Sequence, residues 1–78
     1  MTINFDIEKQ AETPFGTVLI GRFMEQPPYF ASDQKFKLGK FEFELWGVPR
    51  KGIWTLKLVT DTVFNEAMEE QVVVLDIL

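Results

Sequence analysis

Chemistry in this chain would have to rest on carboxylates, lysines and hydroxyls, because none of its 78 residues is a histidine or a cysteine. Histidine is the side chain that titrates near neutral pH without a perturbed pKa, and it is the commonest metal ligand. Without cysteine there is no thiolate nucleophile, no disulfide and no cysteine-ligated metal. The composition therefore excludes most familiar catalytic groups, and it favours a non-enzymatic protein without a cofactor.

A pair of carboxylates, Glu42 and Glu44, is the first candidate for general acid–base chemistry. Such chemistry needs two carboxyl groups a few ångströms apart, in environments that separate their pKa values. Here the two glutamates alternate with apolar residues throughout the segment 41–45. This alternation predicts that both lie on the solvated outer face of a strand.

Other candidates for catalysis or metal binding have equally ordinary interpretations. Glu66, Glu69 and Glu70 offer the oxygen ligands that calcium and magnesium prefer, but they lack the aspartate-rich, glycine-centred loop of a dedicated site. They predict an acidic turn and no metal site. Ser32 has no histidine to activate it, so a hydroxyl that caps a loop is its expected role. The sequence predicts no catalytic residue.

Basic residues interleave with aromatic ones in the middle of the chain, as in barrels that bind single-stranded nucleic acid. The residues that could contact a nucleic acid or an acidic partner are Lys35, Lys37, Lys40, Arg50 and Lys51. The formal net charge of −4 opposes the attraction to phosphates that dominates such binding. Phe36 and Phe41 are more simply explained as core residues. A nucleic-acid partner is therefore disfavoured.

The segment 24–30 and Trp46 are the candidates for protein binding. The segment joins a stiff diproline, Pro27 and Pro28, to Tyr29 and Phe30, which offer large contact areas at low entropic cost. The alternative for this segment is a lid, with Phe30 folded onto an open barrel end and Tyr29 half exposed. Trp46 is expected to point outward, where it would form a protein contact or a dimer seam, or would cover a second buried face.

These candidates must be positioned by short strands, and the first two are marked clearly. Ile3, Phe5 and Ile7 alternate with polar residues, which is typical of a strand with one buried face. A connection is expected over 10–14. The run 16–23 then carries aliphatic residues on both faces, with Gly21 marking a bulge or a sharp bend.

The rest of the chain continues this pattern after a long loop over 24–34. Residues 36–38 lead through Gly39 into the alternating strand 41–45, and the turn formers of 47–52 predict a hairpin with the run 53–60. The segment 62–71 suits a short helix or a strand, and we favour a strand followed by a turn near Glu69 and Glu70. The β-branched run 72–78 closes the set.

About six short strands without a long helix indicate an all-β fold, a small antiparallel β-barrel or sandwich formed by a single domain over residues 1–78. Charge is divided unevenly within it. The segment 33–57 holds six basic and three acidic residues, hence 6 − 3 = +3, whereas 61–78 holds five acidic residues and no basic one, hence −5. If these segments lie on different sides, the molecule is electrically polarised.

Three strings, read together, are similar to the second domain of translation-factor GTPases, the β-barrel that follows the nucleotide-binding domain in elongation factor Tu. They are the opening strand Phe5-Asp6-Ile7-Glu8, the strand Gly16-Thr17-Val18-Leu19-Ile20-Gly21-Arg22, and the element from Lys37-Leu38-Gly39-Lys40 to Leu45. A weaker match runs from Leu58 through Phe64 to Leu78. The resemblance departs from the family at Thr13-Pro14-Phe15-Gly16 and at the long diproline loop. It implies a barrel fold and contact with ribosomal components or RNA.

The sequence thus predicts a non-enzymatic protein-binding module, and three versions of it stay open. The first is a free-standing translation-factor-like barrel. The second is an inhibitor or accessory protein, encoded by a phage or mobile element, that binds a host protein. The third is a structural subunit of an assembly, and an edge left open by the last strand could pair with a second copy. No leader or membrane-spanning run is recognisable, so a cytoplasmic location without membrane contact is the expectation.

Overall fold

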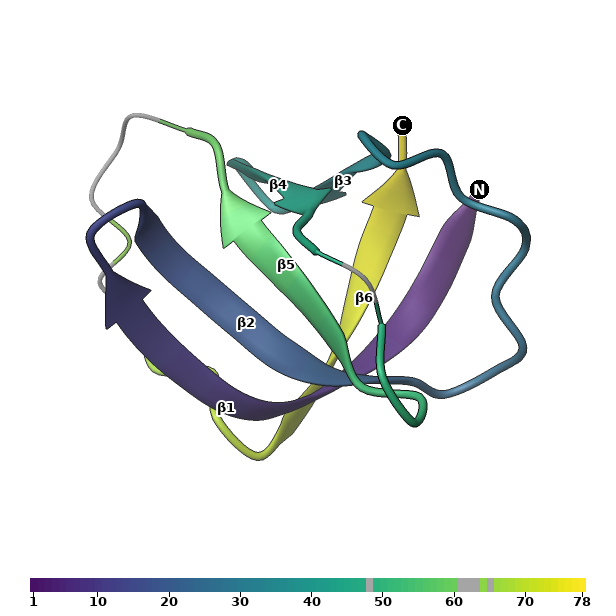
Figure 1. Cartoon of the computed structure of the whole chain (residues 1–78), viewed down its shortest axis with the longest axis horizontal. Helices are drawn as coiled ribbons and strands as arrows, with labels where there is room; N and C mark the ends of the chain where they lie inside the picture. Colours follow the sequence, from purple (N-terminus) through teal and green to yellow (C-terminus); the bar gives the residue numbers. More distant parts are fainter. Residues whose placement is uncertain (48, 61–63, 65) are drawn as a thin grey trace.

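The computed structural model describes residues 1–47, 49–60, 64 and 66–78, and its strands form a closed antiparallel β-barrel (Figure 1). The strands are β1 (Thr2–Thr13), β2 (Gly16–Phe23), β3 (Lys35–Leu38), β4 (Phe41–Leu45), β5 (Trp54–Leu58) and β6 (Gln71–Ile77). Around the barrel their order is β1-β2-β5-β4-β3-β6. The described residues contain no helix, and therefore none that could cross a bilayer. The predicted all-β barrel of six strands is confirmed.

The first hairpin is longer than the alternation predicted. A connection over 10–14 is wrong, because β1 continues to Thr13 and pairs with Gly16 on β2. The Thr13 side chain makes the tight turn possible: its hydroxyl donates to the carbonyl oxygen of Gly16 over 2.8 Å and accepts from the amide of Phe15 over 3.1 Å. The segment 10–13 lacks the alternation of a strand, since none of its β1 residues is fully buried.

A bulge in β1 lies opposite Gly21 and explains that glycine. Ile7 pairs with Gly21 and Lys9 pairs with Ile20, so Glu8 is the extra residue on β1. The backbones approach so closely here that a β-carbon on Gly21 would overlap the carbonyl oxygen of Asp6. Glycine is required because no side chain fits between the two strands. The sequence predicted an irregularity at Gly21 on β2, and the structure places the extra residue of the bulge on β1.

Two further hairpins follow the long loop, and the second of them, β4–β5, is the one that the sequence predicted. β3 and β4 are joined at Gly39, whose φ of 60° is easily adopted by a glycine. β4 and β5 pair with Leu45 opposite Leu56, and the loop between them ends in a narrow turn. The basic segment 33–57 thereby forms the contiguous strands β3, β4 and β5, whereas β6 belongs to the acidic segment. The sheet order therefore keeps most of the two charge groups on different stretches of the barrel.

The connection from β5 to β6 differs from the favoured strand. Residues 61–63 and 65 lie outside the described residues, but Phe64 and 66–68 form neither strand nor helix. A side chain makes the hydrogen bonds that a neighbouring strand would otherwise make. The side-chain amide of Gln10 donates to the carbonyl oxygen of Glu66 over 2.9 Å and accepts from the backbone amide of Met68 over 2.9 Å. The turn at Glu69 and Glu70 is confirmed, with a φ of 58° at Glu70.

The double contact of Gln10 leads to a stability prediction. Gln10→Ala should lower the free energy of unfolding by about 1–2 kcal/mol, because the substitution removes two hydrogen bonds and each contributes about 0.5–1.5 kcal/mol. Urea unfolding followed by circular dichroism measures the change. Gln26→Ala is the matched control at an exposed glutamine and should stay within about 0.5 kcal/mol of the parent. Equal effects of the two substitutions would contradict this role of Gln10.

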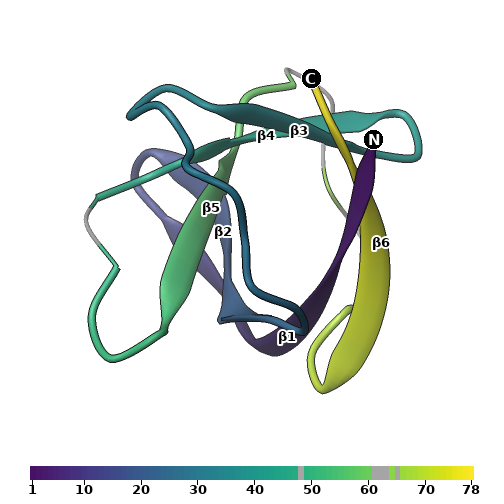
Figure 2. The same ribbon diagram turned by 90° about the vertical axis from the view of Figure 1, so that its right-hand side faces the viewer.

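Inward-facing aromatic and aliphatic residues fill the barrel. The largest side chains that are fully buried are Phe5, Phe36, Phe43, Ile7, Leu19, Leu56 and Leu75. Phe64 closes one end: it is 6% exposed, and its ring meets those of Phe41 and Phe43 nearly at right angles. The other end is crossed by the loop 24–34, and both termini lie there (Figure 2). The two ends of the barrel thus differ in what covers them.

Candidate functional site

The loop 24–34 is fixed at both of its ends. At its start, the Met24 amide donates to the carbonyl oxygen of Asn4 over 2.9 Å, and the Asn4 amide donates to the Glu25 carboxylate over 3.0 Å. At its end, the Gln34 carbonyl oxygen accepts from the Leu45 amide over 3.0 Å, and the Gln34 side chain donates to the carbonyl oxygen of Leu78 over 2.8 Å. These bonds reach β1, β4 and the C-terminus, so they hold the loop across one end of the barrel.

An aromatic cluster holds the middle of the same loop. The Phe30 ring lies 5.2 Å from that of Phe36, 5.5 Å from that of Phe23 and 5.9 Å from that of Trp54, measured between centroids. The tilted and edge-to-face geometries are those that aromatic pairs favour. Phe30 thus packs onto the open barrel end, as the lid interpretation expected. Tyr29 does not fit that interpretation, because it is 96% exposed and not half exposed.

A second loop, 46–53, faces the first from the β4–β5 hairpin. Its tip is a narrow turn in which Arg50 and Ile53 exchange two backbone hydrogen bonds of 2.9 and 3.2 Å. Both central residues are left-handed, with φ 53° at Lys51 and 77° at Gly52. This combination is typical of the tight hairpin turn that matches the twist of the flanking strands. Arg22 supports the tip by donating to the carbonyl oxygen of Lys51 over 3.1 Å.

Between these two loops lies a groove of about 680 Å³, which we call the barrel-end groove. Its lining residues are Gln26, Pro27, Pro28, Tyr29, Phe30, Ala31, Ser32, Leu45, Gly47, Pro49 and Trp54. None of them carries a charge at neutral pH, and most are apolar or aromatic. Ser32 is the one aliphatic hydroxyl, and no carboxylate or lysine accompanies it in the lining. The groove therefore offers shape and apolar contact, without an acid–base pair.

The structure brings together four of the residues predicted to bind protein and separates the fifth. Pro27, Pro28, Tyr29 and Phe30 all line the barrel-end groove. Trp46 does not, although its neighbours Leu45 and Gly47 do. Alternation along the chain turns it to the outside of the barrel. Trp46 is therefore a separate candidate from the diproline segment, on another surface of the barrel.

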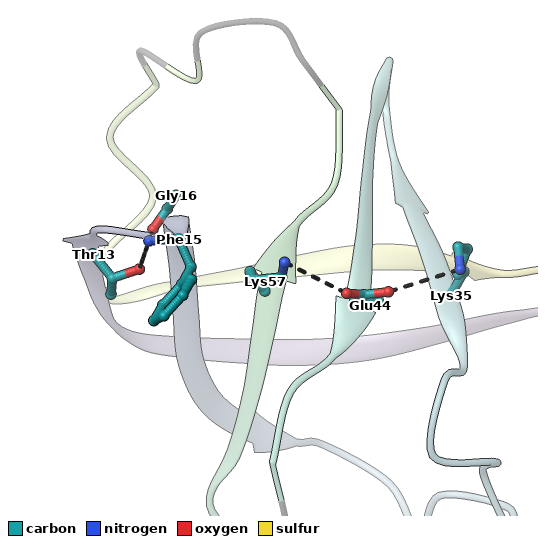
Figure 3. Close-up of polar contacts among 6 residues, drawn as sticks. All are labelled: Thr13, Phe15, Gly16, Lys35, Glu44 and Lys57. Carbon is teal, nitrogen blue, oxygen red and sulfur yellow. Dashed lines mark hydrogen bonds and ion pairs between the residues drawn. The ribbon is translucent and has the colours of Figure 1, made fainter.

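Trp46 belongs to a small aromatic pair on the outer face. It is 39% exposed, and its ring lies 5.8 Å from that of Phe15, which is 69% exposed. Figure 3 shows Phe15 projecting from the turn that Thr13 and Gly16 fix, beside β2. Val18 on β2 is buried although it lies outside the core cluster.

The predicted basic residues do not form one patch. Lys40, at the β3–β4 turn, and Arg50 with Lys51, at the β4–β5 turn, lie at opposite ends of β4. Lys35 is bound within the sheet: its Nζ lies 3.7 Å from Glu44 Oε2, while Lys57 Nζ lies 3.6 Å from Glu44 Oε1, so that a row of charges crosses β3, β4 and β5 (Figure 3). A further cross-strand pair sets Lys37 opposite Glu42. Of the predicted basic residues, Lys35 and Lys37 thus lie beside acidic residues.

The charge row should contribute little to stability. Glu44→Gln is expected to lower the free energy of unfolding by about 0.5–1 kcal/mol at low salt, because the glutamate retains contact with water. The difference should shrink at high salt, which screens exposed charges. Thermal unfolding of parent and variant at two salt concentrations measures this. A loss above about 2 kcal/mol that persists at high salt would contradict the interpretation.

The aromatic residues that interleave with the lysines face inward. Phe36 is 0% exposed and Phe41 is 4% exposed, so neither ring is available for stacking with a base. They are core residues, as expected. A surface for single-stranded nucleic acid would need exposed aromatic rings beside its basic groups, and Phe36 and Phe41 do not supply them.

An acidic hollow of about 410 Å³ lies near the other end of the barrel. It is lined in part by Glu12, Glu66 and Glu69. Two of their carboxylates make hydrogen bonds within the fold: that of Glu12 accepts from the Thr17 hydroxyl over 2.5 Å, and that of Glu69 accepts from the backbone amide of Gln10 over 3.1 Å. Within the residues that the structure describes, no group of three acidic side chains is arranged to hold a metal ion. Glu69 lies in the turn with Glu70, and Glu66 lies in the irregular segment before it.

Sequence reasoning missed the described residues that line the groove from outside the loop 24–34, namely Leu45, Gly47, Pro49 and Trp54. Leu45 and Trp54 were assigned to strands and Pro49 to a turn, all correctly. Trp54 gave a signal that could have been used: it stands at the end of a strand, where an inward-facing side chain reaches the rim of a barrel. No local sequence pattern indicates that the loop preceding Trp54 lies opposite the loop 24–34.

The geometry defines a class: a six-stranded antiparallel barrel with an uncharged, aromatic-lined groove at one end. Comparison with family models, curated proteins and solved structures found no match for the chain. The functional argument accordingly rests on the groove itself.

Proposed function

We propose that this chain is a non-enzymatic protein-binding module and that the barrel-end groove is its binding surface. The observation that carries the proposal is an uncharged groove of about 680 Å³ beside a tyrosine that is 96% exposed. Grooves of this kind bury apolar area without desolvating charges, and aromatic residues at their rims supply much of the binding energy in protein interfaces. The described residues of the lining include no acid–base pair that would suit catalysis instead.

The rigidity of the groove supports the same proposal. Its two loops are held by backbone hydrogen bonds at Met24 and Gln34, by a narrow turn at 50–53 and by the packing of Phe30 on the core. A surface that is ordered before binding loses less conformational entropy when it binds. The diproline adds to this because its backbone angles are restricted in the free protein.

The central experiment is a binding measurement with Tyr29→Ala. The purified protein is immobilised, proteins retained from a lysate of the cells that make it are identified by mass spectrometry, and the strongest is purified. Calorimetry should then show that Tyr29→Ala weakens binding by about tenfold or more, as truncation of an interface aromatic commonly does. The free energy of unfolding should change by less than about 0.5 kcal/mol, because Tyr29 packs on so little.

Val74→Ala is the matched control, because Val74 is 56% exposed on β6, outside the groove lining. It should leave the affinity unchanged. A partner whose affinity falls with Val74→Ala and is indifferent to Tyr29→Ala would overturn the proposal.

The identity of the partner separates the three versions of this function. A ribosomal protein would favour the translation-factor-like barrel, and an unrelated host protein would favour an inhibitor or accessory role. Retention of the chain by a second copy of itself, with an oligomer at micromolar concentration in gel filtration, would favour a structural subunit. In each version the Tyr29 comparison applies without change.

A further inference from the structure

The chemistry of the barrel-end groove narrows the kind of partner. We infer that it takes an extended, proline-containing peptide segment that carries a carboxylate where it meets Arg50 and Lys51. This inference rests on the proposed function and adds the partner class to it. Three features carry the inference: the flat lining of the groove, its continuation past Trp54, and the charge at one end.

The lining consists largely of flat or rigid rings. Tyr29 and Trp54 present aromatic rings, and Pro27, Pro28 and Pro49 present pyrrolidine rings. Prolyl segments in the extended polyproline conformation fit aromatic-lined grooves, because the peptide is already ordered and loses little entropy. Their carbonyl oxygens are not used in internal hydrogen bonds, and the Tyr29 hydroxyl and Trp54 indole are hydrogen-bond donors. The lining thus matches such a segment in shape and in hydrogen-bonding character.

The groove also continues, which favours an extended ligand over a compact one. A second hollow of about 320 Å³ adjoins it and shares Gln26, Pro27 and Trp54 with it. Gly52 also lines this second hollow, so the track passes the tip of the 46–53 loop. A segment lying over Trp54 would contact both hollows in succession.

Positive charge at the tip of the loop 46–53 favours a ligand with an acidic end. Arg50 and Lys51 are exposed, and neither forms an ion pair with any residue that the structure describes. The charges nearest in the second hollow are already engaged: Arg22 pairs with Glu8 over 3.0 Å, and Glu25 accepts from the Asn4 amide. Two free cations beside an uncharged groove complement a peptide that is apolar along its length and acidic at one end.

Lys51 itself marks the tip as more than a structural turn. Its φ of 53° is left-handed, a conformation in which glycine or asparagine is usual and a lysine is strained. The narrow turn and the Arg22 hydrogen bond to its carbonyl oxygen keep the Lys51 backbone in this conformation. A lysine at this position adds positive charge where the turn alone would favour a neutral residue.

The same lining argues against nucleic acid in this groove. Binding of a phosphate backbone depends on several basic contacts along the track. The groove has none in its lining, and its basic groups stand at one end. A peptide with a single acidic end uses this arrangement, whereas a polyanion would leave most of its charges over an apolar floor.

The test uses three ten-residue peptides and the whole chain labelled with nitrogen-15. The first carries Pro-Pro-Leu repeats with Asp-Asp at each end, the second has Lys-Lys at each end, and the third keeps the aspartates but replaces every proline with alanine. Acidic ends on both sides allow either direction of binding. Two-dimensional amide spectra are recorded as each peptide is added.

The first peptide should cause saturable shifts at the Trp54 indole and in loops 24–34 and 46–53, with a Kd below about 1 mM. The other two should bind at least about fivefold more weakly. Arg50→Glu leaves one negative and one positive charge at the tip, so it should abolish the preference between acidic and basic ends, with a spectrum otherwise like that of the parent. If that variant does not fold, the parent protein suffices for the test. Raising the salt concentration from about 20 mM to about 500 mM should weaken binding of the first peptide, and this peptide should still bind more tightly than the one without proline.

Absence of saturable shifts with the first peptide, or equal binding of all three, would overturn the inference. Its failure is distinct from failure of the proposed function. If Tyr29→Ala weakens the natural partner while the first peptide does not bind, the groove binds protein of another kind and this inference alone is wrong. If the natural partner ignores Tyr29→Ala, the proposed function itself is wrong.

Discussion

Gly21→Ala should destabilise the barrel by about 3 kcal/mol or more, the upper end of what overpacking costs. The added β-carbon would overlap the carbonyl oxygen of Asp6, and it would lie 2.9 Å from the Asp6 carbonyl carbon and 3.1 Å from the Ile7 Cα. All three atoms belong to the backbone of β1, so no side-chain rotation relieves the clash. The strand would have to move at its bulge, where the barrel is most strongly bent. Urea unfolding followed by circular dichroism measures the loss.

Gly39→Ala is the control for this substitution. A β-carbon there meets no atom within 4 Å, so only the backbone angle opposes it. With a φ of 60° the cost should be about 1 kcal/mol. The difference between the two variants isolates the close approach of β1 and β2. If Gly21→Ala costs no more than Gly39→Ala, the two strands separate easily and the explanation of the bulge is wrong.

Phe36→Ala should cost about 3–5 kcal/mol, the range for removing a fully buried aromatic ring. A domain of this size has a total stability of about 4–12 kcal/mol, so the loss removes about a quarter of it or more and should lower the midpoint of thermal unfolding strongly. The ring of Phe36 lies 5.9 Å from that of Phe23 and 5.2 Å from that of Phe30. Its loss therefore removes the support under the loop 24–34 as well as core volume. Thermal unfolding gives the stability.

Phe36→Leu separates these two consequences. Leucine keeps most of the buried volume, and the variant should fold with a loss of about 1.5 kcal/mol. It lacks the ring on which Phe30 rests, so binding at the barrel-end groove should weaken severalfold in the folded protein. A folded Phe36→Leu variant with the affinity of the parent would show that Phe30 is held by Phe23 and Trp54 without Phe36.

Much of the fold is determined by local sequence pattern. Ile3, Phe5 and Ile7 alternate with polar residues, and a strand is the conformation that places them on one face. Gly39 and the turn formers of 47–52 are likewise local signals, since a narrow turn requires residues that adopt particular backbone angles. The pattern failed over 10–13, where no residue of β1 is fully buried and the sequence therefore does not alternate. It failed also at Phe64 and 66–68, where one glutamine side chain makes the hydrogen bonds that a neighbouring strand would otherwise make.

The candidate site was determined only in part by the sequence. Composition alone excluded histidine and cysteine chemistry, and a diproline followed by two aromatic residues pointed to the loop 24–34. The tertiary structure decided which residues join this loop. It brought Pro49 and Trp54 beside it and turned Trp46 to the outer face, because the order β1-β2-β5-β4-β3-β6 places segments together that are distant in the chain. Strand alternation is a property of neighbouring residues, whereas a groove between two loops depends on closure and register, which no local pattern contains.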